Sequence, residues 1–350
     1  MLGINTASRT LYFGSGGFQE ARGLHTGADF FLDNLKEELD QEGEWFVDAV
    51  QRRIYLWPNA TTTHTNKGED GFIYLSGSDS KETGGAPSAS QPHPQRRAKP
   101  GLLVASQSDC ILSVQGSSPT ELVEGFSVHG LTFAHTSATY MQSPEVPSGG
   151  DWSVLRVGAL QLERVRNASV VECTFRDLGG NALVVSDTAY NTSIVGNHFV
   201  WLGASAVLVL GRLDGMDGSA GPVTYPIGTV IHANLMHELG IWVKQSAGVG
   251  QALARASTID GNICFNVPRA CVNLNDGFGG AHAVKHNLLF NAVRETADHG
   301  PFNSWDRQPY ISPKSDGTAS LQQDVSTVHN NFIINKCVSR TQRQRHNAAS

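Results

Sequence analysis

The stretch IVGNHF at residues 194–199 contains a pattern that recurs six more times in the chain. The pattern is Val or Ile, two variable residues, usually Asn, one more variable residue, and an apolar residue. Val or Ile holds the first position in all seven copies, and Asn holds the fourth in five. The other copies are VHGLTF (128–133), VVECTF (170–175), IHANLM (231–236), IDGNIC (259–264), VKHNLL (284–289) and VHNNFI (328–333). A motif repeated this strictly indicates a stack of similar coils.

The spacing of these copies distinguishes between the known repeat folds. Equivalent positions are 24 to 44 residues apart, which indicates a base period near 24 with extra residues in particular copies. This period is too short for a four-stranded propeller blade, and the leucines of a leucine-rich repeat are missing. No helical spacing of apolar residues runs through the repeats either.

A second strand-like run follows the Asn position by nine to twelve residues, at 182–185, 206–209, 271–274 and 296–299. Short strands stacked ~4.8 Å apart in successive coils form a parallel β-helix. Asn repeated at one bend suits a ladder of side-chain hydrogen bonds. The sequence therefore predicts an all-β fold, a right-handed parallel β-helix over residues 102–337.

Each second run has an inward and an outward position, because side chains alternate between the two faces of a strand. The inward positions are Leu183, Val207, Val272 and Ala297, and the outward ones are Val184, Leu208, Asn273 and Asp298. The outward position thus changes from apolar to polar along the chain. Insertions are expected at 134–158, 212–227, 244–256 and 299–325, and function in repeat proteins tends to lie on such insertions.

The segment before the repeats, residues 1–101, is organised differently. Residues 30–58 predict a short helix, a turn at Gly43, and a β-hairpin of WFVDA (45–49) and RIYLW (53–57). Residues 77–100 are rich in Ser, Pro, Gly and charged residues, which predicts a mobile insertion. After the last repeat, residues 338–350 are polar and predict a disordered tail.

The bulk composition excludes several classes of function. A net charge of −6 and a sequence pI near 6.1 argue against nucleic acid as a partner. No uninterrupted apolar run approaches the ~18 residues of a membrane span, and the N-terminus of this chain does not read as a signal peptide. The five cysteines form no CxxC pair, so neither a disulfide framework nor a zinc site is predicted.

Three aspartates near the last coils are the candidate catalytic groups. Asp276 and Asp298 are 22 residues apart, about one coil, which predicts a separation of roughly 5–10 Å. That range covers both the retaining and the inverting arrangements of carboxylates in glycoside hydrolysis. Asp306 offers a third carboxylate in the same polar and aromatic stretch.

The residues around these aspartates suit a sugar. Lys244, His299 and Arg307 are positioned to tune carboxyl pKa values, since a nearby cation lowers the pKa of a carboxyl group. Apolar ring faces and amides for a sugar ring come from Trp242, Phe278, Phe302, Trp305, Asn273 and Asn303, and the pair Asp151 and Trp152 offers a further approach from the first insertion.

A purely structural interpretation competes with this one. Asp and Asn at β-helix turns commonly hydrogen-bond the backbone, and the Gly-rich DGFGG at 276–280 is ordinary turn chemistry. His232, His282, His286 and His329 suggest a metal site at first sight. No arrangement of carboxylates and histidines fixes one, so these histidines are expected to be solvated surface residues and no metal is predicted.

Several long motifs resemble one family of carbohydrate-active proteins. They are DNLKEELDQEGEWFVDAVQRRIYLWP (33–58), TSATYMQSPEVPSGGDWSV (136–154), HELGIWVKQSAG (237–248), NDGFGG (275–280) and ETADHGPFNSWDRQPY (295–310). In this order they resemble right-handed β-helix proteins close to glycoside hydrolase family 141, over about residues 10–335. The resemblance implies an extracellular protein that acts on plant-type polysaccharides as an α-L-fucosidase or xylanase. It places the catalytic role on Asp276 in NDGFGG, and on Asp298 and Asp306 in DHGPFNSWDR.

The chain departs from this family at both ends. Similar proteins have further coils before residue 1 and after the last repeat, so a partial polypeptide of reduced catalytic competence is expected. Two other functions stay open. A polysaccharide lyase or uronate epimerase would use Lys244 or His299 as a base, with Ca²⁺ at the uronate, whereas a non-catalytic solenoid would bind or adhere to glycans. Hydrolysis itself requires no cofactor here, and the sequence leaves the sugar and the oligomeric state open.

Overall fold

The computed structural model describes residues 3–12, 34–41, 44–57, 73–76, 106–143, 145, 154–212, 224–275, 279–296, 299–305 and 324–335. The chain divides into two compact units. One consists of Met1–Gly23 together with Ser106–Ser350, and the other of Leu24–Ala105. Among the described residues no helix is long and apolar enough to cross a membrane.

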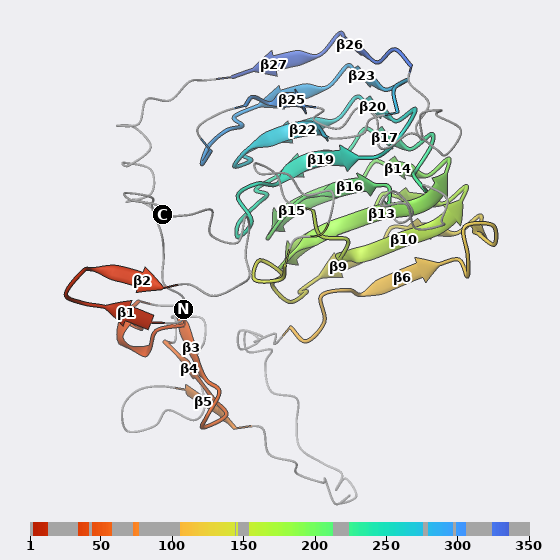
Figure 1. The fold of residues 1–350 in the computed structure, drawn as a ribbon. Coiled ribbons are helices and arrows are strands. Elements are labelled where there is room, and N and C mark those ends of the chain that lie inside the picture. Colours follow the sequence, from red (N-terminus) through yellow and green to blue (C-terminus); the bar gives the residue numbers. More distant parts are fainter. Residues whose placement is uncertain are drawn as a thin grey trace, which may run out of the picture. The chain divides into compact units, whose positions relative to one another are not determined.

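The first unit contains three parallel sheets whose strands come from successive coils (Figure 1). Sheet 1 comprises β6 (Leu112–Gln115), β10 (Gly158–Arg166), β13 (Asn181–Tyr190), β16 (Val207–Leu210), β19 (Ala247–Ala252), β22 (Ala270–Asn275) and β25 (Phe302–Trp305), with β7 (Val123–Glu124) beside β10. Sheet 2 comprises β8 (Ser127–His129), β11 (Ser169–Val171), β14 (Ser193–Val195), β17 (Val230–His232), β20 (Thr258–Asp260), β23 (Ala283–Lys285) and β26 (Thr327–His329). Sheet 3 comprises β9 (Thr132–Ala134), β12 (Thr174–Leu178), β15 (His198–Leu202), β18 (Leu235–His237), β21 (Ile263–Phe265), β24 (Leu288–Phe290) and β27 (Phe332–Ile334).

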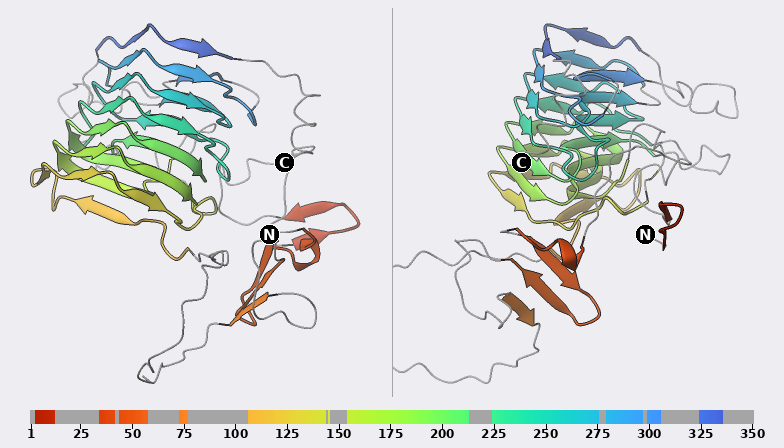
Figure 2. Two further views of the ribbon diagram at one scale, coloured as in Figure 1. Left: turned by 180° about the vertical axis from the view of Figure 1, so that it is seen from behind. Right: turned by 90° about the vertical axis from the view of Figure 1, so that its left-hand side faces the viewer.

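Each strand pairs with its counterpart in the next coil, so the sheets run the length of the stack in chain order (Figure 2). The fold is a right-handed parallel β-helix, and the prediction from the sequence is confirmed. Strands β1 (Gly3–Asn5) and β2 (Thr10–Tyr12) form a separate antiparallel pair in the same unit.

The repeated motif forms the corner between sheets 2 and 3. Its third residue has a positive φ in all seven copies, from 50° at Glu172 to 67° at Gly196. This left-handed conformation turns the chain through the corner, and Gly adopts it without the steric cost that a side chain incurs. The first and last residues of the motif flank the corner and point into the core, where Val170, Ile194, Phe175 and Phe199 are fully buried.

The Asn that follows the corner links consecutive coils, as the sequence predicts. The side-chain oxygen of Asn234 accepts from the backbone N–H and from the side-chain amide of Asn197, at 2.9 Å in both cases. Asn262 accepts in the same way from Asn234. The ladder starts at the backbone N–H of Cys173 and ends at Asn331. Inside the corner, the rings of Phe133, Phe175 and Phe199 stack with centroids 4.8 and 4.9 Å apart.

The second unit contains the predicted hairpin. Strands β3 (Trp45–Asp48) and β4 (Arg53–Leu56) pair antiparallel, and β5 (Ile73–Ser76) adds a third strand to β4. The short helix is a single 3₁₀ turn, Lys36–Glu38. The expected turn at Gly43, the insertion at 77–100 and the tail at 338–350 lie outside the described residues.

Two expectations about the last coils are wrong. The segment 244–256 is not a simple insertion, because it contains β19, a core strand of its coil. In the coil of β25, Phe302 and Asn303 lie opposite Val272 and Asn273, in the positions expected for Ala297 and Asp298. β25 begins five residues later in the chain than expected, because the turn before it is hydrogen-bonded along the turn before β22. In that turn, the backbone N–H groups of residues 293–296 donate to carbonyls of residues 267–269.

Candidate functional site

The outward face of sheet 1 changes its chemistry along the helix. From β10 to β25, one outward column contains Gln161, Val184, Leu208, Gly250, Asn273 and Asn303, and the other contains Glu163, Ser186, Leu210, Ala252, Asn275 and Trp305. Apart from Ser186, the middle coils are apolar, and the last two coils carry amides and an indole. The polar side chains on this face are therefore concentrated toward its two ends.

A short segment covers the apolar middle of this face. Val154 is fully buried in a cluster with Val184, Leu208, Leu210 and Ala252. The side-chain amide of Asn181 holds the segment by donating to the carbonyls of Leu155 and Val157, at 3.0 Å in both cases. Residues 154–157, here called the clasp, therefore seal the outer face over β13, β16 and β19.

Arg156 fixes the clasp from its other side. Its guanidinium lies 3.0 Å from the Glu145 carboxylate and also donates to the carbonyl of Gly211. The backbone N–H of Arg156 donates to Glu145 at 2.8 Å, and its carbonyl accepts from the Gln161 amide at 3.0 Å. These contacts join the clasp to three separate parts of the chain.

Beyond the clasp, β22 and β25 carry the amides. The side chain of Asn303 donates to the side-chain oxygen of Asn273 at 2.7 Å. Asn275 lies opposite Trp305, whose indole is 56% exposed. Asn275 itself is only 2% exposed, and within the described part of the chain its side-chain amide donates no hydrogen bond. A buried donor without an acceptor carries a free-energy cost, which an acceptor oxygen placed against this amide would remove.

The turns that lead into sheet 1 carry a second group of predicted residues. Lys244 lies 2.7 Å from the Glu295 carboxylate and donates to the Ile241 carbonyl at 2.9 Å. The fully buried Arg269 contacts Nε2 of His299 at 2.9 Å. A guanidinium can only donate, so His299 accepts through Nε2. Trp242, 40% exposed, stacks on Tyr140 with ring centroids 5.8 Å apart.

The structure thus separates the predicted sugar-binding residues into two groups. Asn273, Asn303 and Trp305 lie on the outer face of sheet 1, whereas Trp242, Lys244 and His299 lie at the turns before its strands. Phe302 belongs to neither group, because it packs against the core. Asp276, Asp298, Asp306, Arg307, Phe278, Asp151 and Trp152 lie outside the described residues.

A charged network at the other end of the face was not anticipated. Glu163 lies 2.9 Å from Arg164 and 3.1 Å from Arg212, and Asp187 lies 3.6 and 3.5 Å from the same two guanidinium groups. Two carboxylates are thus matched by two arginines, which indicates a structural brace and not an acid–base pair. The alternation of residues in GALQLERVR (158–166) predicts that Glu163 points outward. The position of Asp187 could not be predicted in this way, because Asp187 has a positive φ of 61° and lies next to a register shift in β10.

His232, His286 and His329 are exposed, as expected, whereas His282 is not. His282 is 2% exposed instead of solvated, and burial lowers its pKa to about 4. His232 and His286 lie on the surface of sheet 2 beside Asp260, with His286 at 2.9 Å from its carboxylate. Within the described residues, no three His, Cys, Asp or Glu side chains converge in a way that could hold a metal ion.

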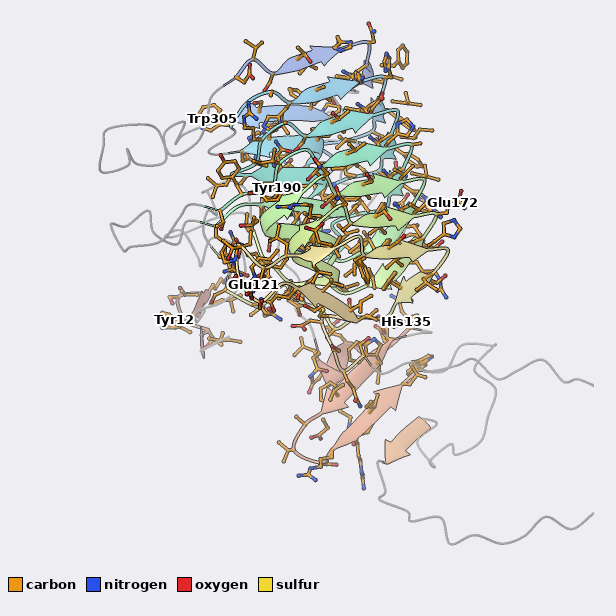
Figure 3. All side chains as sticks on the ribbon, turned by 90° about the vertical axis from the view of Figure 1, so that its right-hand side faces the viewer. Tyr12, Glu121, His135, Glu172, Tyr190 and Trp305 are labelled. Carbon is orange, nitrogen blue, oxygen red and sulfur yellow. The ribbon has the colours of Figure 1, made fainter. Side chains whose placement is uncertain are left out.

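Figure 3 shows where these surfaces lie on the stack. Trp305 and Tyr190, at the carboxyl ends of β25 and β13, lie on one side, and Glu172, at the corner between sheets 2 and 3, lies on the opposite side. The candidate site and the Asn corner are therefore on different sides of the β-helix.

Comparison with known proteins supports the fold. No established protein family and no curated protein matches the sequence. A solved structure described as a glycoside hydrolase is similar, with a TM-score of 0.54 and 13% identity over 89% of this chain and 59% of that one. The chain thus spans about 59% of the length of this relative. The A-module of mannuronan C-5 epimerase AlgE4 from Azotobacter vinelandii matches 65% of this chain and 77% of its own, at 14% identity and a TM-score of 0.27.

Proposed function

We propose that the protein acts on polysaccharides as a glycoside hydrolase-like enzyme, with Asp276 and Asp306 as its carboxylate pair. One observation carries the proposal: Asn275 and Trp305 are partners on adjacent strands. Asp276 and Asp306 are the next residues along the chain. In the register between β22 and β25, each aspartate therefore directly follows one member of a cross-strand pair at the carboxyl ends of these two strands.

Covalent geometry sets the range of their separation. Adjacent strands are ~4.8 Å apart, and one residue further along the chain spans ~3.8 Å. Two carboxyl groups that start this close can reach the ~5 Å separation of a retaining pair or the ~6.5–9.5 Å of an inverting pair. In either case one carboxyl protonates the glycosidic oxygen, and the other acts as nucleophile or activates water.

Asp298 receives a different role in this proposal. It precedes His299, which contacts Arg269 at the amino end of β22. Asn275, at the other end of β22, is six residues further along the chain than Arg269, about 20 Å of strand. A fully buried guanidinium requires an anionic partner, and we assign Asp298 to Arg269 as that partner. Its removal is expected to affect stability more than the catalytic step.

The neighbouring side chains provide the sugar contacts. The exposed indole of Trp305 offers an apolar surface to a sugar ring. The Asn275 amide donor and the Asn273–Asn303 pair lie on the same two strands. Amides of this kind hydrogen-bond sugar hydroxyls and fix the position of the ring relative to the carboxylates.

The residues proposed as a base for a lyase are engaged otherwise. Lys244 is paired with Glu295, and His299 accepts from Arg269. Hydrolysis is therefore better supported than β-elimination. Similarity in sequence motifs to glycoside hydrolase family 141 and a location outside the cell are further parts of this proposal.

A hydrolysis screen tests it. The chain is incubated with a panel of plant polysaccharides, and new reducing ends are measured for the wild type, Asp276→Asn, Asp306→Asn and Asp298→Asn. We expect the first two variants to lose about 10²–10⁴-fold in kcat/KM without unfolding, the usual effect of removing a general acid or base. Asp298→Asn should lower the melting temperature instead.

Asp177→Asn is the matched control, because Asp177 is an exposed aspartate with a positive φ that Asn tolerates. Turnover that survives in Asp276→Asn and Asp306→Asn would refute the assignment of the pair. Unsaturated products would indicate a lyase, and glycan binding without turnover would indicate a non-catalytic solenoid.

A further inference from the structure

Two aromatic rings from distant coils meet on the turns that lead into sheet 1. Tyr140 follows β9 and Trp242 follows β18, with β12 and β15 between these strands in sheet 3. At ~4.8 Å per strand, β9 and β18 are about 14 Å apart. The two ring centroids are nevertheless only 5.8 Å apart, and the rings are inclined by 29°. The chain therefore brings Tyr140 and Trp242 together across two coils, and this pair is here called the ring platform.

Glycines in the two intervening coils make this meeting possible. A Cβ on Gly180 would lie 2.6 Å from Oγ1 of Thr139, the residue before Tyr140. A Cβ on Gly203 would collide with the backbone of the preceding coil and lie 2.8 Å from Cδ1 of Trp242. Neither glycine has a left-handed φ, so the backbone conformation does not require glycine at these positions. Close packing of the turns and of the indole requires it instead.

The indole of the ring platform stays accessible to solvent. Trp242 is 40% exposed, although tryptophan is highly buried on average in folded proteins. Its coil lies in the middle of the stack, since β18 pairs with β15 on one side and with β21 on the other. The exposure is therefore not that of an end of the stack. A ring that is already held in place loses little conformational freedom when a ligand packs on it.

An ion pair supplies polar groups beside the indole. The ammonium of Lys244 lies 2.7 Å from the carboxylate of Glu295. It also donates at 2.9 Å to the carbonyl of Ile241, in the peptide bond that leads to Trp242. Both charged side chains are partly exposed, and the backbone N–H of Glu295 donates to the Pro268 carbonyl at 3.1 Å. A donor and an acceptor of opposite charge thus lie next to an exposed ring.

A neutral sugar matches this combination of groups. Its C–H groups pack on an aromatic ring, and its hydroxyl groups both donate and accept hydrogen bonds. An ammonium has three donors and a carboxylate has four acceptor sites, so Lys244 and Glu295 can bond hydroxyl groups without breaking their ion pair. An anionic sugar would gain no net attraction from a pair of zero net charge, and its carboxylate would be repelled by Glu295.

We propose that the ring platform, with Lys244 and Glu295, is a second binding site for a neutral polysaccharide, separate from the proposed catalytic site. Trp242 precedes β19, at the amino ends of the sheet 1 strands. Asp276 and Asp306 follow β22 and β25 at the carboxyl ends, and a strand of six residues such as β22 spans about 20 Å. A single sugar ring cannot reach both places, whereas a polymer can. This second site rests on the proposed function only for the class of its ligand.

Affinity gel electrophoresis tests the second site, with arabinoxylan and glucomannan as neutral polysaccharides and alginate and polygalacturonate as acidic ones. All variants carry Asp276→Asn and Trp305→Ala, which remove turnover and the other exposed ring. We expect at least one neutral polysaccharide, and neither acidic one, to retard this background chain. Adding Trp242→Ala should weaken binding about tenfold or more, because aromatic anchors contribute much of the binding energy at such contacts. Trp242→Phe should keep most of the affinity.

Trp201→Ala is the matched control, since Trp201 is 54% exposed in the same unit, and it should bind like the background chain. Thermal unfolding shows whether each variant is folded. Lys244→Met decides the matter if Trp242→Ala does not fold, because it keeps the ring platform, removes the donor and should weaken binding several-fold.

Full binding in folded Trp242→Ala or Lys244→Met would overturn the proposal. So would equal losses in Trp201→Ala and Trp242→Ala, or a background chain that binds no neutral polysaccharide or only acidic ones. The proposed function fails separately, because it is measured as turnover in the chain that retains Asp276. A chain that hydrolyses nothing but binds through Trp242 would refute the catalytic pair and keep the second site.

Discussion

The side-chain amide of Asn303 donates a 2.7 Å hydrogen bond to the side-chain oxygen of Asn273, across two adjacent coils of the β-helix. The bond joins the two strands whose next pair, Asn275 and Trp305, ends beside Asp276 and Asp306. It holds the amide of Asn303 in one orientation and leaves its carbonyl oxygen to accept. Alignment of the two strands and the sugar contact that we propose for these strands thus involve the same pair.

Trp305→Ala tests whether the exposed indole binds substrate. The variant should raise KM about tenfold on the polysaccharide that the screen identifies, with kcat little changed, because about 1.4 kcal/mol of sugar binding would be lost. Steady-state kinetics measure both constants. Trp201→Ala is the matched control, since Trp201 is 54% exposed on sheet 3 and Trp305 56% on sheet 1. Equal effects of the two substitutions would remove Trp305 from the site.

Asn234→Ala tests the ladder. Asn234 is 1% exposed, and its side chain joins Asn197, Asn262 and the carbonyl of Ile194. Removing it leaves several buried groups unpaired, which should lower the free energy of unfolding by about 2–4 kcal/mol. Urea denaturation gives this value. Asn335→Ala, at an exposed asparagine beyond the ladder, should change it by less than about 0.5 kcal/mol. A similar small change in Asn234→Ala would contradict the structural role.

Val154→Asp tests the clasp. A carboxylate placed among Val184, Leu208, Leu210 and Ala252 would be desolvated without a partner, so we expect the clasp to detach at a cost of about 2–4 kcal/mol. Limited proteolysis should then cut near residues 145–157 faster than in the wild type. Val325→Asp, at a valine that is 78% exposed, should leave both stability and cleavage unchanged. Unchanged proteolysis in Val154→Asp would show that the clasp does not depend on this contact.

His282 predicts a loss of stability in acid. The pKa of His282 is lowered to about 4, chiefly by burial and to a smaller extent by the nearby Arg255, against the opposing effect of a backbone hydrogen bond at Ala254. The unfolded chain binds the proton near pH 6.5, so between pH 6.5 and 4 only the unfolded state gains it. The free energy of unfolding therefore falls by up to about 3 kcal/mol over this window and is unaffected above it.

Urea denaturation at several pH values measures the His282 effect. His282→Gln should flatten the dependence between pH 4 and 6.5, whatever it costs in packing. His329→Gln, at an exposed histidine, should keep the wild-type slope. An unaltered slope in His282→Gln would assign the acid sensitivity to other groups.

The fold could be predicted because the repeated motif combines positions with narrow chemical requirements. Only apolar side chains fit the core at Ile194 and Phe199, and the amide of Asn197 donates to one coil while it accepts from another along the ladder. Strand β19 could not be predicted from the sequence, because AGVGQA contains only one β-branched residue, Val249. Its glycines are required by close packing: a Cβ on Gly248 would lie 2.6 Å from the Cys271 carbonyl oxygen, and one on Gly250 2.7 Å from Leu208.

The candidate site could be predicted only in part. The change from Val184 and Leu208 to Asn273 in the outward column was readable from alternation, and the structure retains it. The partner of Asn273 was not readable, because the turn at residues 293–296 bonds along residues 267–269 and delays the next strand. Hydrogen bonds between turns that are distant in the sequence cause β25 to begin later, and this later start cannot be derived from a fixed repeat length. The clasp was equally hidden, since nothing local marks Val154 as the residue that covers β16.

The Asn ladder also bears on how the molecule opens. Each side-chain oxygen in it accepts only from the coil before, so a coil in the middle satisfies its bonds only when both neighbours are folded. Nearest-neighbour coupling of this kind makes a solenoid behave as a one-dimensional cooperative array. Amide hydrogen exchange should therefore be slowest around Asn234 and faster toward Asn331, where the chain of amides ends. A break at Asn234 would divide one cooperative unit into two that melt separately.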